Sequence, residues 1–348
     1  MPAVVRTLTE RELNRAILAR QLLLARVRLP IARALERVGG LQSQYAPTAY
    51  IGLWSRLEGF ARGDLTRALE RRTVVQGTLM RATIHIVSAR DYAALAAGIR
   101  TRRREAWVQA TRRRDLVPVV ERAARRVREL LADGARGRPE LLDALGVDTT
   151  TWNGLQLWVD LLRVPPSGTW EQRRADRFAT AATWIGPSEV SEEEGLELLL
   201  RRYLGGFGPA SRRDVASFTG LSPKVLAPVL ERVATRRFRD EAGEDLLDLP
   251  RAPLPDPDTP APTRFLGTWE ALLLVHARRT QVLPEAYRPL VFATKTPQSV
   301  STFLVDGRVA GTWTLDGGRV RPRPFDPLPR EARRELADEA ERLSAFMR

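Results

Sequence analysis

The chain has 348 residues, of which 43% are hydrophobic and 28% charged, so it can form two or three folded domains. It contains no cysteine and only two histidines, which excludes disulfides, thiolate metal sites and cysteine nucleophiles. Its 56 basic and 42 acidic residues give a formal charge of +14, and that balance favours a polyanionic partner such as duplex DNA.

The first 62 residues are predicted to be mainly helical and to form the first unit of the chain. Apolar residues recur with helical spacing from Leu13 to Leu24, and a second short helix is predicted over 33–38. Two glycines end that helix, and the segment LQSQYAP follows them, closed by Pro47. This segment is therefore expected to lie outside the interior of a long helix, although a short helix can begin within it.

After residue 62, a pattern of helices followed by a β-ribbon occurs three times, over 63–116, 117–188 and 189–250. The second and third copies align as GRPELLDALGVDTTTWNGL beside GPASRRDVASFTGLSPKVL. This order of helix, glycine corner, helix, capped helix and hairpin is typical of a winged helix. Two unrelated helical hairpins are the alternative interpretation.

The elements of the three copies are predicted from periodicity and turn residues. The expected helices lie at 64–71, 119–131, 138–145, 150–162, 191–204, 211–219 and 222–233. The expected β-ribbons are VVQGTLMRATIHIVS, RVPPSGTWEQ and FRDEAGEDLLDLP, the last with Gly243 at its tip.

A proline-rich linker is predicted at 251–262, and a C-terminal region of β-hairpin and helix at 263–348. The hairpin is FLVDGRVAGTWTL with Asp306 and Gly307 as its turn, and the terminal helix covers 330–348. The predicted fold is α+β and mainly helical, with three tandem winged-helix modules before this region. Three such modules in one chain can wrap a basic surface around a duplex, so a monomer is sufficient.

Five segments together resemble the AlkZ-like winged-helix DNA glycosylase family: GGLQSQYAP, GTLMRATIHIVSARDY, GFGPASRRDVASFTGL, QVLPEAYR and VDGRVAGTW. The resemblance runs from about Leu13 to Trp313. It implies tandem winged helices that form a C-shaped DNA channel. It also implies a monofunctional glycosylase, without cofactor or metal, that removes N7-alkylated purines, including the two bases of an interstrand crosslink.

The catalytic motif of that family is a Gln, one residue, and then Gln or Asp, which the resemblance places on Gln42 and Gln44. The middle position is often aliphatic in the family and is Ser43 here. The form ending in Gln implies the branch tied to self-resistance against DNA-alkylating natural products. The alternative is that both amides only hydrogen-bond backbone near a helix end.

Two amides suit this chemistry even though a carboxamide has no useful pKa for acid–base catalysis. An N7-alkylguanine is already cationic and leaves as a neutral base, so it needs no proton from the protein. What remains is to place a water near C1′ and to stabilise an oxocarbenium-like sugar, which amide dipoles can assist. If residues 41–45 are extended, both glutamine side chains share one face.

Other residues are expected to contact DNA, each with a plain structural alternative. The resemblance points to a strand histidine, the arginine runs before and after Trp107 offer charge for phosphates, and a lysine lies in a predicted first helical turn. The alternatives are a satisfied core histidine, a solvated helix face and ordinary capping. These expected DNA-binding residues are His85, Arg100, Arg102, Arg103, Arg104, Arg112, Arg113, Arg114, Ser222, Lys224, Lys295, Thr296 and Gln298.

Two classes of function follow. The first is a DNA glycosylase acting on double-stranded DNA, and the second is a non-enzymatic winged-helix DNA-binding protein such as a transcriptional regulator. No apolar run approaches the roughly 18 to 20 residues that span a bilayer, so we expect a cytoplasmic, nucleoid-associated protein. Incubation with N7-methylguanine DNA followed by hot alkali separates the two classes, because only the first yields strand breaks.

Overall fold

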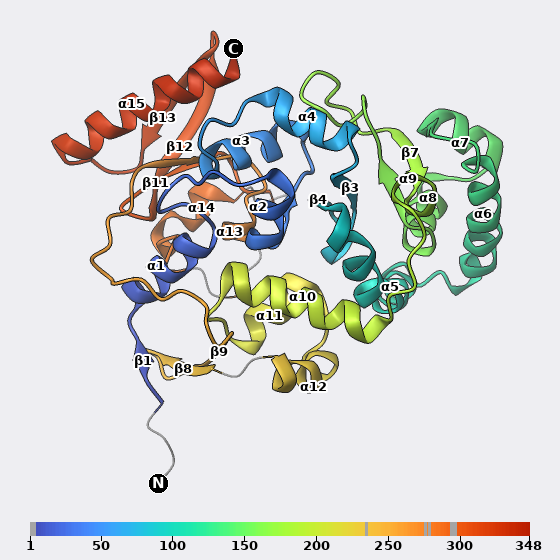
Figure 1. Ribbon diagram of the computed structural model, residues 1–348, viewed down its shortest axis with the longest axis horizontal. Helices are drawn as coiled ribbons and strands as arrows, with labels where there is room; N and C mark the ends of the chain where they lie inside the picture. The colour runs from blue at the N-terminus through green and yellow to red at the C-terminus, as the bar shows by residue number, and fades with distance from the viewer. Residues whose placement is uncertain (1–4, 234–235, 275–276, 278–279, 293–297) are drawn as a thin grey trace.

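The computed structural model describes residues 5–233, 236–274, 277, 280–292 and 298–348. In these stretches the chain has an α+β fold that combines many helices with three β-sheets (Figure 1). Within the same stretches, no helix is long and apolar enough to cross a membrane.

Helix α1 (Glu10–Arg20) begins with a capping box in which Thr9 and Glu12 satisfy each other's backbone N–H groups. It ends before the predicted end at Leu24. Leu22 has a φ of 58°, so the chain turns there while its side chain stays buried. The apolar periodicity extended the prediction because burial continues through the turn.

Helix α2 (Ile31–Val38) leads into the sheet through two glycines. Gly40 has a φ of +82°, and a Cβ at this position would lie 2.8 Å from Val87 Cγ1. Only glycine combines this backbone conformation with such a close approach to the sheet. After a short extended stretch, α3 (Ala46–Arg56) begins, so the chain from 41 to 45 is held between two helices.

The first two repeats share one six-stranded sheet. Its strands, in spatial order, are β2 (Leu41–Gln42), β4 (Ile84–Ser88), β3 (Val74–Thr78), β6 (Leu161–Arg163), β7 (Arg177–Thr180) and β5 (Arg136–Gly137). The predicted ribbon of the first repeat is confirmed as β3 and β4. Because β3 also pairs with β6, strands of both repeats lie in one sheet. The predicted ribbon RVPPSGTWEQ is wrong apart from Arg163, because 164–172 form part of the loop between β6 and β7. The edge strand β2 ends at Gln42, and Ser43 and Gln44 follow it.

The helices of these two repeats are α4 (Arg62–Glu70), α5 (Ala89–Thr111), α6 (Val117–Leu130), α7 (Arg138–Leu145), α8 (Thr149–Trp158) and α9 (Ala181–Ile185). In Figure 1, α6, α7 and α8 lie together at one end of the long axis. The prediction for 150–162 is wrong at its end, because α8 stops at Trp158 and 161–163 form β6. The end of that stretch, WVDLL, is apolar apart from Asp160, so its pattern fits a helix and a short buried strand equally.

The third repeat contains three helices and a hairpin: α10 (Glu192–Phe207), α11 (Arg212–Thr219), α12 (Pro223–Val233), β8 (Arg236–Asp240) and β9 (Asp245–Asp248). Gly243 lies in the hairpin turn, as predicted, with a φ of +82°. The strand β1 (Thr7–Leu8) pairs in parallel with β8, which no local pattern indicated.

Helix α10 crosses α5 at backbone contact. A Cβ on Gly98 would lie 2.4 Å from the carbonyl carbon of Gly195. The two glycines therefore allow the first and third repeats to pack more closely than side chains permit, and any larger residue at either position forces the helices apart.

The C-terminal region is a four-stranded antiparallel sheet: β10 (Arg264–Leu266), β11 (Thr302–Val305), β12 (Arg308–Asp316) and β13 (Arg319–Pro324). The predicted hairpin and its Asp306–Gly307 turn are confirmed, but β10 and β13 were not predicted. Two prolines hid β13, yet as an edge strand it tolerates residues without a donor. The helices of this region are α13 (Ala271–Leu274), α14 (Arg288–Val291) and α15 (Arg330–Met347).

The proline-rich segment 251–262 contains no helix or strand, as predicted. It is tied down by α1, because Arg15 Nε donates to Thr259 O at 2.7 Å and Arg20 Nη2 donates to Pro253 O at 3.0 Å. Arg20 also forms a fully buried ion pair with Asp248 at 2.7 Å. These hydrogen bonds hold the proline-rich segment against α1. The C-terminal region begins directly after this segment.

Candidate functional site

Gln42 and Gln44 both contact the beginning of β4. Gln42 is paired with His85 across the antiparallel strands β2 and β4, so their side chains share one face of the sheet. The backbone stays extended through Ser43, whose N–H donates to Ile84 O at 2.8 Å. Gln44 is exposed, and its Oε1 accepts the N–H of Ile84 at 2.6 Å.

Arg81 holds the amide of Gln42. It lies in a 3₁₀ turn between β3 and β4 with a φ of 53°, and its Nη2 donates to Gln42 Oε1 at 3.0 Å. Its Nη1 donates to the carbonyl of Phe218 in α11, and its guanidinium lies 5.7 Å from the Phe218 ring centroid. Burial lowers the pKa of Arg81 to about 10, so the side chain remains a cation at neutral pH.

His85 is neutral at physiological pH. Burial and the nearby charge of Arg81 lower its pKa to about 3, although the Thr83 carbonyl favours the charged form. Nδ1 lies 3.0 Å from Thr83 O, which can only accept, so the proton of the neutral ring is on Nδ1. Nε2 is then an acceptor on the same sheet face as Gln42, which suits a hydrogen bond from water better than proton transfer.

The unusual serine of the motif also has a partner in the sheet. Ser43 is 1% exposed, and its hydroxyl accepts a hydrogen bond from Gln76 Nε2 at 3.2 Å. A buried hydroxyl requires such a partner, and an aliphatic residue would leave the amide of Gln76 without it. The hydrogen bond between Gln76 and Ser43 therefore explains the serine at this position. It connects β3, which contains Gln76, to the residue after β2, on the other side of β4.

The arginines of α5 lie in different environments. Arg102 is exposed and pairs with Glu105 at 2.9 Å, whereas Arg103 is largely buried and its Nη1 donates to the carbonyls of Thr78 and Leu79 at 2.5 and 3.2 Å. Burial lowers the pKa of Arg103. Arg103 thus holds the corner between β3 and the turn that carries Arg81, and its contact with DNA stays a prediction.

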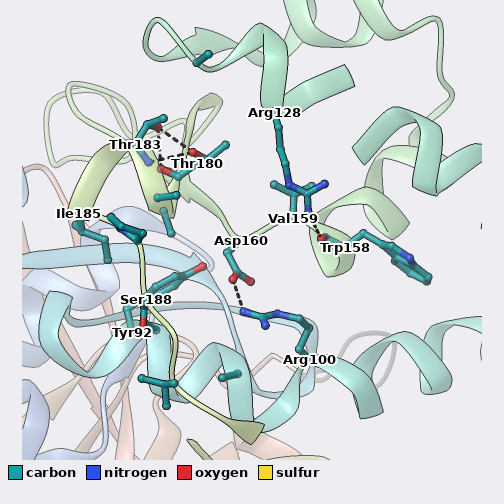
Figure 2. Close-up of a pocket in the computed structure, with 18 of the residues that line it drawn as sticks. Tyr92, Arg100, Arg128, Trp158, Val159, Asp160, Thr180, Thr183, Ile185 and Ser188 are labelled. Carbon is teal, nitrogen blue, oxygen red and sulfur yellow. Dashed lines mark hydrogen bonds and ion pairs between the residues drawn. The ribbon is translucent and has the colours of Figure 1, made fainter. Parts of the chain in front are cut away.

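Arg100 and Arg128 line a cavity of about 490 Å³ (Figure 2). Arg104 lines the same cavity. Arg100 forms an ion pair with Asp160 at 2.6 Å, and Arg104 Nε donates to Leu157 O at 3.0 Å. Among the described lining residues, the charged ones are three arginines and one carboxylate, so the cavity is positive. It lies between α5, α6 and α9, and neither glutamine of the motif lines it.

The remaining predicted DNA contacts are spread over the surface. Arg112, Arg113 and Arg114 follow α5 and are exposed, with Arg113 paired to Asp115 at 2.8 Å. Ser222 and Lys224 are exposed at the start of α12. Gln298 lines a cavity of about 390 Å³, whereas Lys295 and Thr296 lie outside the described residues.

Sequence reasoning missed two side chains next to the motif. Arg81 lies in the segment GTLMRATIHIVSARDY, where a single basic residue between Met80 and Ala82 is the available signal, but its contact with Gln42 depends on a positive φ. Arg173 comes from the loop before β7, and its Nη1 donates to the hydroxyl of Tyr45 at 2.7 Å. The sequence separation of these two residues conceals the contact. In the described part of the chain, no group of three His, Asp or Glu residues can hold a metal ion.

Comparisons with known proteins agree on one family. The model of the family described as DNA glycosylase AlkZ-like matches residues 35–346. Among solved structures, the DNA glycosylase AlkZ from Streptomyces sahachiroi is similar over 98% of each chain, with a TM-score of 0.80 and 19% sequence identity. At that identity the likeness shows a shared fold. No curated protein sequence matches the chain.

Proposed function

Because this chain belongs to the AlkZ-like DNA glycosylases, we propose that it hydrolyses the bond between deoxyribose and a cationic N7-alkylated purine. We include adducts of DNA-alkylating natural products and interstrand crosslinks among its substrates, as the Gln-x-Gln motif suggests. Family membership favours an enzyme over a non-enzymatic regulator. We further propose that the three repeats act as winged helices along a DNA channel, in a cytoplasmic, nucleoid-associated monomer.

The observation that carries this proposal is the fixed pair of amides at the start of β4. Arg81 orients Gln42, and the Ile84 N–H orients Gln44, so neither side chain has to be ordered when the reaction begins. Preorganised dipoles stabilise developing charge without reorganisation in the transition state. The two side chains would therefore hold a water near C1′ and stabilise the oxocarbenium-like sugar.

The charges around the site fit a reaction that needs no acid. His85, on the same face as Gln42, has a pKa of about 3 and cannot serve as a proton donor at neutral pH. A cationic purine leaves as a neutral base, so only the water must lose a proton. Because neither amide titrates, the two glutamines themselves add no pH dependence to the excision rate.

Excision is tested on a duplex with one N7-methylguanine. The protein is incubated with the end-labelled duplex, and hot alkali then cleaves the strand at each abasic site. Cleavage at the lesion with wild-type protein, and its loss in Gln44→Ala, supports the proposal. An unmodified duplex is the control, and wild-type protein that leaves the lesion intact would contradict the proposed substrate.

A further inference from the structure

A cavity of about 390 Å³ opens beside the Gln-Ser-Gln segment. Tyr45, the residue after Gln44, lines it and is 44% exposed. Its other walls come from α3, from β12 and from the loop before β7, with Ile51, Trp313 and Leu315 among the apolar residues. The volume falls in the range of about 300 to 1,000 Å³ that small-molecule sites occupy.

Exposed apolar surface gathers at this cavity. Among the described residues, the large hydrophobic side chains that are exposed are Val5, Tyr45, Leu290 and Leu315. Tyr45 and Leu315, which is 47% exposed, line the same cavity although they are far apart in sequence. Two of these four exposed side chains therefore meet at one cavity, and they add apolar surface to its walls.

At the rim of the cavity, Arg173 contacts two aromatic rings. Arg173 lies with its guanidinium 5.8 Å from the ring centroid of Tyr45 and 5.8 Å from that of Trp170. Its hydrogen bond to the Tyr45 hydroxyl, at 2.7 Å, keeps this ring in place. A rigid tyrosine under a guanidinium offers stacking to an aromatic group, and Arg173 is the one charged residue among the described residues that line the cavity.

We propose that this cavity receives the apolar, flat substituent that a bulky N7 adduct carries, while Gln42 and Gln44 act at the glycosidic bond. The inference rests on the proposed function and names its preferred substrate class. A methyl group on N7 is too short to fill a cavity of this size. A neutral aromatic substituent would bury Leu315 and Tyr45, whereas the positive charge of Arg173 disfavours a cationic one.

The test compares two lesions in the same duplex, N7-methylguanine and N7-(naphthylmethyl)guanine, in single-turnover excision. Leu315→Glu places a charge at the cavity wall and should slow excision of the bulky lesion about 10-fold, the loss expected for one apolar contact, with N7-methylguanine unchanged. Leu290→Glu, at an exposed leucine that does not line the cavity, is the matched control and should change neither rate. Arg173→Ala should reproduce the selective loss, and the melting temperature of each variant verifies folding.

Equal losses for both lesions in Leu315→Glu would assign the cavity to an unmodified nucleotide of the duplex and overturn the inference. The same holds if Leu315→Glu leaves both rates unchanged. Failure of wild-type protein to excise either lesion would overturn the proposed function, and with it this inference. Normal excision of N7-methylguanine together with no selectivity in the variants overturns the inference alone.

Discussion

Arg81 Nη2 lies 3.0 Å from Gln42 Oε1, so a half-buried cation fixes the amide on the edge strand of the six-stranded sheet. The same guanidinium donates to the carbonyl of Phe218, which joins the turn between β3 and β4 to α11 of the third repeat. The orientation of Gln42 therefore depends on packing between repeats. A shift of α11 relative to the turn between β3 and β4 would therefore move Arg81, and with it the amide of Gln42.

Arg81→Met should lower the single-turnover excision rate about 100-fold, because a reactive group that moves by about 1 Å can lose that much. Arg81→Lys should restore part of the rate. A lysine retains the charge, but it lacks the two guanidinium nitrogens that donate to Phe218 O and Gln42 Oε1 at the same time. We expect duplex affinity to change much less than the rate. An equal fall in affinity and rate would show that Arg81 binds DNA and does not act as a positioning residue.

Gln44→Ala and Gln42→Ala should each reduce excision of N7-methylguanine by about 10² to 10³, because each removes a placed polar group that acts mainly in the transition state. Duplex affinity should stay near wild type in both variants. The melting temperature should stay near wild type in Gln44→Ala, because Gln44 is exposed, but should fall in Gln42→Ala, because Arg81 Nη2 loses its buried acceptor. Gln109→Ala, at an exposed glutamine on α5, serves as the control and should be fully active. Gln44→Asp retains an acceptor and should keep measurable activity. Wild-type rates in both alanine variants would make the motif purely structural.

His85 should make the fold less stable in acid. Its pKa is about 3 in the folded protein and about 6.5 when unfolded, so only the unfolded state binds the proton between these values. The full contribution of the neutral His85 to the free energy of unfolding is present above pH 6.5. Below pH 6.5 this contribution falls by about 1.4 kcal/mol per pH unit, until the pH approaches 3.

The measurement is the difference in unfolding free energy between wild type and His85→Gln from pH 4 to 8. Because glutamine does not titrate, the difference should shrink as the pH falls below 6.5 and stay constant above it. A constant difference over the whole range would mean that His85 is not held neutral by burial.

Phosphate contacts should dominate DNA affinity, given the charge of +14, so wild-type affinity should fall about 10³-fold or more from 50 to 200 mM salt. Replacing the exposed Arg112 and Arg114 together with Ala should reduce the slope of log affinity against log salt by up to about 2. Arg333→Ala with Arg334→Ala, on exposed positions of α15, makes the same change in net charge. If this control pair lowers the slope equally, Arg112 and Arg114 contribute only long-range charge.

Local signals predicted much of the fold. Ser191 and Ser211 placed the beginnings of α10 and α11, because a serine side chain satisfies the first N–H groups of a helix. Gly220, with a φ of +73°, placed the end of α11, whereas α10 continues to Phe207, beyond its predicted end at Leu204. The Asp306–Gly307 turn likewise followed from its dipeptide. Strands without such signals were missed, as with β1, which is two residues long and pairs with β8 far along the chain.

Most helices, the first β-ribbon and two hairpin turns could be predicted from the sequence, because these features depend on residues close together in the chain. The net charge and the positions of the two glutamines are read from it directly. The tertiary structure decided which side chains surround those glutamines. Arg81 reaches Gln42 only because its turn adopts a positive φ, and Arg173 reaches Tyr45 only because strands of two repeats share one sheet. Such contacts join residues tens to more than a hundred positions apart, and no local periodicity specifies them.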